Sequence, residues 1–103
     1  MMREVILTIG LNDQVSKVQE ISTENAMEII TNVIADHTDG ATIYPAKGIY
    51  RHFDGSLITE NSIRIECIEP DEKRLYAAAM ILKEKLNQET IVWENRMIDS
   101  ALV

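Results

Sequence analysis

The chain has 103 residues, of which 46% are hydrophobic and 26% charged, a composition typical of an ordinary globular domain and not of a disordered one. This length suffices for a single core, so any sizeable ligand site is expected on a face or between subunits. Ten basic against seventeen acidic residues give a net charge of −7, which disfavours direct binding to a nucleic-acid backbone. An acidic surface favours solubility and also attracts basic partner proteins.

The N-terminal segment predicts a strand rather than a signal peptide. Residues 1–10 contain one basic residue and an apolar run of five, which is too short for an export signal. No run approaches the roughly 20 apolar residues of a membrane span. We therefore expect a cytoplasmic location in the producing or infected cell and no contact with a membrane.

The first predicted elements are a strand and a helix. Apolar side chains alternate from Val5 to Leu11, which predicts a strand with one buried face. Residues 12–20 are polar and have no period, so they predict a loop. Ser22 is a favourable N-cap for a helix that runs to about Asp36. This helix carries an apolar stripe at helical spacing, formed by Ala26, Ile29, Ile30, Val33 and Ile34.

Residues 40–67 predict a long β-hairpin. Pro45 and Gly48 interrupt its first arm, which indicates an edge strand or a bulge. Asp54-Gly55 is a strong turn signal. The return arm alternates apolar and polar residues, which predicts an antiparallel sheet with one covered and one wetter face. Cys67 falls among the apolar positions, so we interpret it as a core residue and not as a reactive thiol.

The C-terminal part of the chain predicts a second helix and a last strand. The helix begins near Pro70 with acidic residues in its first turn, and Asn87 is a plausible C-cap. Residues 90–94 predict the strand, so the expected organisation is a domain over residues 1–95 and a tail over 96–103. The apolar residues of this tail would cover the sheet edge or swap into a neighbouring molecule. The buried stripe of the helix is Leu75, Ala78, Ala79, Leu82 and Leu86.

The predicted order of elements is β-α-β-β-α-β. This order is typical of the ferredoxin-like α+β fold, a four-stranded antiparallel sheet with two helices on one face. The long hairpin joins the second and third strands.

Residues 39–72 and 86–92 resemble a family of small uncharacterised bacterial α+β proteins that are usually exported. The shared features are an aromatic-Arg pair before a Gly turn, a Glu followed by a small polar residue, and a later Gln-Glu-Thr tripeptide. The resemblance covers about residues 6–93 and implies the same fold but no reaction, since none is established for the family. The missing export signal fits look-alike short proteins carried by plasmids and prophages of Gram-positive bacteria. The matching positions are Gly48, Tyr50, Arg51, Gly55, Glu60, Ser62, Gln88 and Glu89.

Ionisable and aromatic residues gather in the predicted hairpin. One interpretation is an open-face site that binds a polar ligand or a partner protein. The other is a solvated face with cross-strand ion pairs, each worth about 0.2–1 kcal/mol. The predicted partner or ligand face consists of Tyr44, Tyr50, Arg51, His52, Glu60, Ser62, Arg64, Glu66 and Glu94.

No pattern in the sequence indicates catalysis, a cofactor or a metal. His52 and Glu60 could form an acid/base pair, but strand pairing is expected to carry His52 away from Glu60. His37 follows a helix, where an interaction with the helix dipole is favoured over a metal because no second His or Cys lies at ligand spacing. Glycine-rich phosphate loops, CxxC and HExxH patterns are missing.

The aromatic residues of the first arm indicate a subunit interface. Tyr44 and Tyr50 lie on the same predicted face, and exposed aromatics on a sheet serve stacking or association. RNA binding would need a basic surround, which this acidic chain lacks. We therefore expect a homo-oligomer, with a dimer favoured.

Three classes of function fit these observations. The favoured one is a non-enzymatic inhibitor encoded by a phage or mobile element. It would act on a host nucleic-acid-handling defence system, as anti-CRISPR proteins do, through acidic side chains that occupy a basic protein partner. The second is an oligomeric regulator or sponge that holds a nucleotide-like signal. The third is an enzyme of the dimeric α+β-barrel type.

Overall fold

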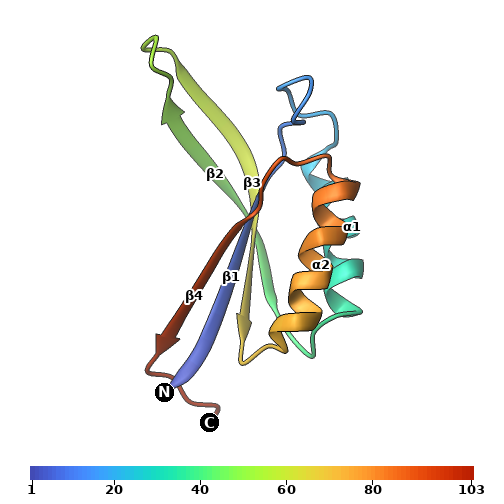
Figure 1. Ribbon diagram of the computed structural model, residues 1–103, viewed down its shortest axis with the longest axis vertical. Coiled ribbons are helices and arrows are strands. Elements are labelled where there is room, and N and C mark those ends of the chain that lie inside the picture. The colour runs from blue at the N-terminus through green and yellow to red at the C-terminus, as the bar shows by residue number, and fades with distance from the viewer.

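The computed structural model describes residues 1–103 and confirms the ferredoxin-like fold. The strands form one antiparallel sheet in the order β2-β3-β1-β4, and both helices cover the same face of it (Figure 1). No helix is long and apolar enough to cross a membrane. The elements are β1 (Met2–Gly10), α1 (Thr23–Ala35), β2 (Thr42–Arg51), β3 (Leu57–Ile68), α2 (Glu72–Lys85) and β4 (Val92–Ile98).

The core lies between the sheet and the helices, where the alternation in the sequence places it. The N-cap of each helix is a side chain that accepts from the backbone: Ser22 bonds to the amide of Asn25, and Asp71 bonds to the amides of Lys73 and Arg74. The core side chains that the sheet contributes are Val5, Leu7, Ile9, Ile63, Ile65 and Cys67, all fully buried.

The hairpin contains an edge strand and no bulge. The register of β2 on β3 runs without interruption from Thr42 opposite Glu66 to Arg51 opposite Leu57. Pro45 is tolerated because β2 lies at the edge of the sheet. The upper half of the hairpin projects beyond the helix layer (Figure 1).

The last strand is longer than the sequence predicts. β4 continues to Ile98, which lies opposite Met2, so residues 96–98 belong to the sheet and only 99–103 follow it. Polar contacts extend the strand: the Arg96 guanidinium lies 2.7 Å from the Glu4 carboxylate. This region has no apolar alternation, so the period that marks a half-buried strand is missing. Asn87 lies one residue beyond the C-cap, at a φ of 48°.

We expect Leu75→Ala to reduce the free energy of unfolding by about 2–5 kcal/mol, because it leaves a cavity between α2 and the sheet. Leu75 is fully buried, whereas Val15 in the loop after β1 is 79% exposed. Val15→Ala is therefore the matched control, with an expected change within about 0.5 kcal/mol. Urea denaturation monitored by circular dichroism measures both. Equal effects of the two substitutions would contradict the assigned core.

Burial raises the pKa of the Cys67 thiol from 9.0 to about 11, so the folded protein favours the neutral thiol. The stabilisation is fully present below pH 9 and is lost as the pH rises toward 11, because the unfolded chain releases the proton first. We expect the free energy of unfolding to fall across this window, and Cys67→Ala to remove that part of the fall. Denaturant titrations at several pH values measure it, and an identical pH dependence in both proteins would contradict the assignment.

Candidate functional site

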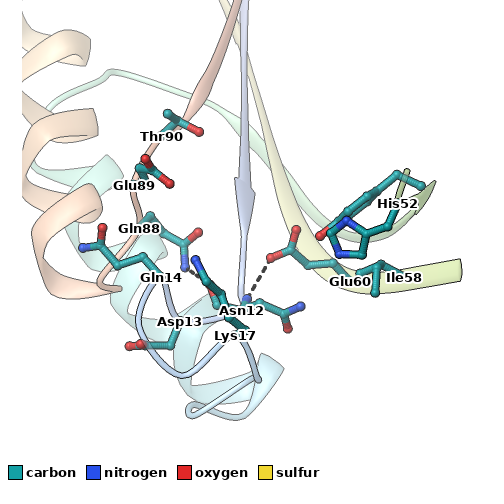
Figure 2. Close-up of a pocket in the computed structure, with 11 residues that line it drawn as sticks. Asn12, Asp13, Gln14, Lys17, His52, Ile58, Glu60, Gln88, Glu89 and Thr90 are labelled. Atoms are coloured by element: carbon teal, nitrogen blue, oxygen red, sulfur yellow. Dashed lines mark hydrogen bonds between the residues drawn. The ribbon is translucent and has the colours of Figure 1, made fainter. Parts of the chain in front are cut away.

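A hollow of about 450 Å³ opens at the end of the sheet where the hairpin leaves the body of the molecule. This volume lies within the range of small-molecule sites, about 300–1,000 Å³. Three segments far apart in the sequence form its walls (Figure 2). The loop after β1 contributes Asn12, Asp13, Gln14 and Lys17, the hairpin contributes Tyr50, His52, Ile58 and Glu60, and the connection from α2 to β4 contributes Gln88, Glu89 and Thr90.

The carboxylate of Glu60 is held in one position. It lies over Gly10 so closely that a Cβ at position 10 would come within 2.6 Å of its Oε2 atom. The backbone N–H of Asn12 donates a hydrogen bond of 2.9 Å to the same oxygen. A hydrogen bond to an ionised acceptor is stronger than one between neutral groups. Glycine at position 10 and the amide of Asn12 therefore fix the acid at the edge of the hollow.

The other side of the hollow is fixed by Gln88, which is only 7% exposed. Its side-chain amide donates to the carbonyl oxygen of Asn12 at 2.8 Å and to that of Leu86 at 3.1 Å. The backbone N–H and the carbonyl oxygen of Asn12 thus link the hairpin to the segment between α2 and β4, as the dashed lines in Figure 2 show.

The floor of the hollow is stiffened by Asp13. One oxygen accepts from the backbone amides of Val15 and Ser16, and the other accepts from the Asn87 side chain at 2.6 Å. The hydrogen bonds from Ser16, Asn87 and Val15, in that order, lower the pKa of Asp13 below its usual value. Asp13 therefore remains ionised in mildly acidic solution and keeps the loop attached to the end of α2.

The hollow is acidic and has an aromatic wall. Asp13, Glu60 and Glu89 contribute three negative charges against the single positive charge of Lys17. Tyr50 and His52 pack edge to face, with ring centroids 5.7 Å apart. Such a site suits a small cation that carries a flat aromatic group, because the carboxylates attract the charge and an aromatic side chain can stack on the ring.

Three residues of the predicted face line this hollow: Tyr50, His52 and Glu60. Strand pairing separates His52 from Glu60 as expected, since Glu60 lies opposite Gly48, four positions before His52. Both side chains nevertheless border the same hollow (Figure 2).

Four other residues of the predicted face form a network on the open side of the sheet. The Tyr44 hydroxyl donates to Glu66 at 2.6 Å and accepts from Arg64 at 3.3 Å. The Arg64 guanidinium also lies 3.5 Å from the Glu94 carboxylate. The hydrogen bond with Tyr44 is the main cause that raises the pKa of Arg64 above its usual value. These polar groups already pair with one another, as the interpretation of cross-strand ion pairs expects.

The last two residues of the predicted face lie outside both groups. Ser62 is buried opposite Gly10 in the β1–β3 ladder. Arg51 belongs to the opposite face by the strand alternation, and its guanidinium donates to the carbonyl oxygen of Gly55 at 2.8 Å. Arg51 thus braces the hairpin turn.

The residues that periodicity missed come from loops. Asn12, Asp13 and Lys17 lie in a polar segment without any period, so no pattern marks them. Gln88 and Glu89 carry a signal in the tripeptide of the family resemblance. Tyr50 and Glu60 belong to the same resemblance. The fold brings these four of its eight positions to one hollow.

No three His, Cys, Asp or Glu side chains converge as metal ligands. His37 contacts the end of α1 instead, where its Nδ1 atom lies 2.7 Å from the carbonyl oxygen of Val33.

No protein-family model matches the chain, and no curated protein is similar to it in sequence. Solved structures are similar in fold. A phage SAM lyase in complex with S-methyl-5′-thioadenosine is 21% identical, with a TM-score of 0.68, over 92% of this chain and 80% of that one. The periplasmic divalent cation tolerance protein CutA from Archaeoglobus fulgidus is 14% identical, with a TM-score of 0.59, over 99% and 88%. A DUF3240 family protein from Shewanella baltica is 10% identical, with a TM-score of 0.56, over 100% and 99%.

These comparisons confirm the ferredoxin-like fold. The proteins of similar fold are small, and one of them belongs to an uncharacterised family. The prediction of an anti-CRISPR-type inhibitor is wrong, because the similar structures are a SAM lyase and cation tolerance proteins. That prediction took the acidic side chains as a surface that occupies a basic protein partner. Three of the acidic side chains, Asp13, Glu60 and Glu89, line the hollow instead of spreading over one face. The similar folds include an enzyme, so the fold itself does not favour a non-enzymatic role.

We expect Gly10→Ala to displace the Glu60 carboxylate and to expose the Asn12 amide that it accepts from. A hydrogen bond to a charged group contributes about 1.5–3 kcal/mol, so the amide should exchange with solvent roughly ten or more times faster. Hydrogen exchange followed by NMR measures this. Gly40→Ala is the control, because a Cβ there meets nothing within 4 Å. Unchanged exchange at Asn12 in Gly10→Ala would contradict the described support of Glu60.

Proposed function

We propose that this chain is a lyase that binds S-adenosylmethionine in the hollow and releases S-methyl-5′-thioadenosine. The observation that carries the proposal is the convergence of Tyr50, Glu60, Gln88 and Glu89 on one acidic, partly aromatic hollow. A phage SAM lyase of similar fold, whose structure contains S-methyl-5′-thioadenosine, supports the choice of substrate.

The chemistry of the substrate fits the side chains. S-adenosylmethionine carries a permanent positive charge on sulfur, and the carboxylates of Glu60 and Glu89 favour it. Tyr50 offers a face on which the adenine ring can stack, an interaction worth about 1–3 kcal/mol. Lys17 is the cation that would attract the substrate carboxylate.

The reaction requires no cofactor. Release of S-methyl-5′-thioadenosine breaks the bond between sulfur and Cγ of the aminobutanoate chain. An oxygen of the substrate's own carboxylate attacks Cγ, so that a C–O bond forms as the C–S bond breaks and the electron pair moves to sulfur. The products are the neutral thioether and homoserine lactone, and no proton is transferred between protein and substrate.

This reaction decides what the acidic residues do. The positive charge on sulfur disappears in the transition state, so a carboxylate beside sulfur stabilises the substrate more than the transition state. We therefore assign to Glu60 the orientation of the substrate rather than stabilisation of the developing product. The Glu60 carboxylate is held in place by the Asn12 amide. In this assignment it keeps the aminobutanoate chain of the substrate folded, so that the substrate carboxylate lies near Cγ, and such orientation lowers the barrier.

The test is incubation of the protein with S-adenosylmethionine, followed by mass spectrometry for S-methyl-5′-thioadenosine and homoserine lactone. We expect Glu60→Gln to reduce the rate by roughly 100-fold, the usual effect of a misplaced reactive group. Glu94→Gln is the matched control, because Glu94 lies in the network of the open face and should leave the rate unchanged. No product and no calorimetric binding with the wild-type protein would overturn the proposal.

A further inference from the structure

The sheet ends in β2 on one side and β4 on the other, and neither is covered by another strand. In an antiparallel ladder, residues bond alternately to one neighbour and to the other. Pro45 has no N–H, and the amide of His52 bonds to the Ser56 carbonyl oxygen at 2.9 Å, so the even-numbered residues of β2 bond to β3. The backbone groups of Ile49 and the other odd-numbered residues therefore point outward.

The same reasoning applies to β4. The amide of Leu11 bonds to Asn61 and that of Glu69 bonds to Arg3, so the odd-numbered residues of β1 face β3. The even-numbered residues of β1 and β4 then bond to each other, in the register that sets Ile6 opposite Glu94. The backbone groups of Trp93 and the other odd-numbered residues of β4 are left for an added strand.

A largely apolar groove of about 230 Å³ runs beside the β4 edge. α2 forms one wall with Tyr76 and Met80, and the other is formed by Trp93 of β4 and by Ile91, which directly precedes this strand. Tyr76 and Trp93 pack edge to face, with centroids 6.2 Å apart, although Tyr76 remains 58% exposed. An open strand edge with a groove for alternate side chains is the arrangement that binds an extended segment.

The projecting half of the hairpin is an extended segment without cover. Ile49 is 67% exposed and Leu57 is 55% exposed on the face that the helices cover further down the sheet. No helix lies over this part of the hairpin (Figure 1). A two-stranded ribbon by itself is only marginally stable in water, so we expect a partner to cover these apolar side chains.

The two surfaces complement each other in charge. Residues 47–53 contain Lys47, Arg51 and His52 and no acidic residue. Residues 88–95 contain Glu89 and no basic residue, and their other acid, Glu94, already pairs with Arg64 on the open face. Residues 47–53 are thus a basic segment in a protein with a net charge of −7, and this charge favours association with the acidic segment 88–95.

The two surfaces also agree in geometry. The outward backbone groups of both edges belong to odd-numbered residues, whose side chains lie on the helix-covered face. Antiparallel pairing sets two such residues opposite each other, so the added strand presents its apolar side chains on the same face as the groove. Parallel pairing would turn the two helix layers to opposite sides.

We propose that β2 of one copy of this chain pairs antiparallel with β4 of a second copy and places Ile49 in the groove beside Trp93. Each copy then contributes one β2 edge and one β4 edge, and a closed assembly pairs all of these edges. Thr90 lines both the groove and the acidic hollow, so the arm of the second copy borders the ligand site. The part of this inference that concerns the ligand rests on the proposed function, whereas the assembly does not.

Native mass spectrometry at micromolar concentration tests the assembly. We expect the wild-type protein to be an oligomer and Ile49→Asp to be a folded monomer, with an apparent dissociation constant at least 100-fold higher. Leu102→Asp is the matched control, since Leu102 is 86% exposed in the C-terminal segment and should leave the oligomer intact. A wild-type monomer, or an Ile49→Asp protein that remains oligomeric, would overturn the proposal. Circular dichroism verifies the fold of both variants.

Calorimetry with S-adenosylmethionine then tests the contribution of the second copy. We expect the monomeric Ile49→Asp protein to bind at least tenfold more weakly than the wild type, because one border of the hollow is missing. Equal binding by monomer and oligomer would overturn the shared site but not the assembly. An oligomer that binds no S-adenosylmethionine would overturn the proposed function, and with it the shared ligand site, while the strand pairing stands.

Discussion

The two backbone groups of Asn12 hold the site together. Its N–H bonds to Glu60 of the hairpin, and its carbonyl oxygen accepts from Gln88 at the end of α2. These contacts join residues 48 and 76 positions apart in the sequence, so each depends on the complete sheet. Gly10 makes the first contact possible by leaving space for the carboxylate. The hollow is therefore a consequence of how β1 ends, and its acid is positioned by backbone atoms that no side-chain substitution removes.

Much of the fold could be predicted from the sequence, because its signals are local. The alternation from Val5 to Leu11, the stripe of α1 and the Asp54-Gly55 turn each follow from a short-range preference that burial reinforces. The end of β4 could not be predicted, since residues 95–98 are held by polar cross-strand contacts such as that of Arg96 with Glu4. Such contacts leave no period in the sequence.

The site was predictable only in part. Glu60, Tyr50 and His52 stand out as polar or aromatic residues in a strand, whereas Asn12 and Lys17 stand in a featureless loop. The net charge was the least informative signal, because a total of −7 does not say where the charges lie. On the open face, Arg64 pairs with Glu94 and Arg96 pairs with Glu4. In the hollow, Lys17 is the single basic side chain beside three acidic ones.

Pro45 has a consequence for the behaviour of the chain in a crowded cell. If the β2 edge of each copy pairs with the β4 edge of the next, copies can be added without limit. Such growth produces fibres when the geometry does not close into a ring. Pro45 removes one outward donor from the middle of β2, so a second sheet cannot bond to this edge along its full length. The proline thereby limits the edge to a short, specific pairing. In the proposed assembly, replacement of Pro45 would lengthen the edge that a second copy can pair with, and so favour aggregation.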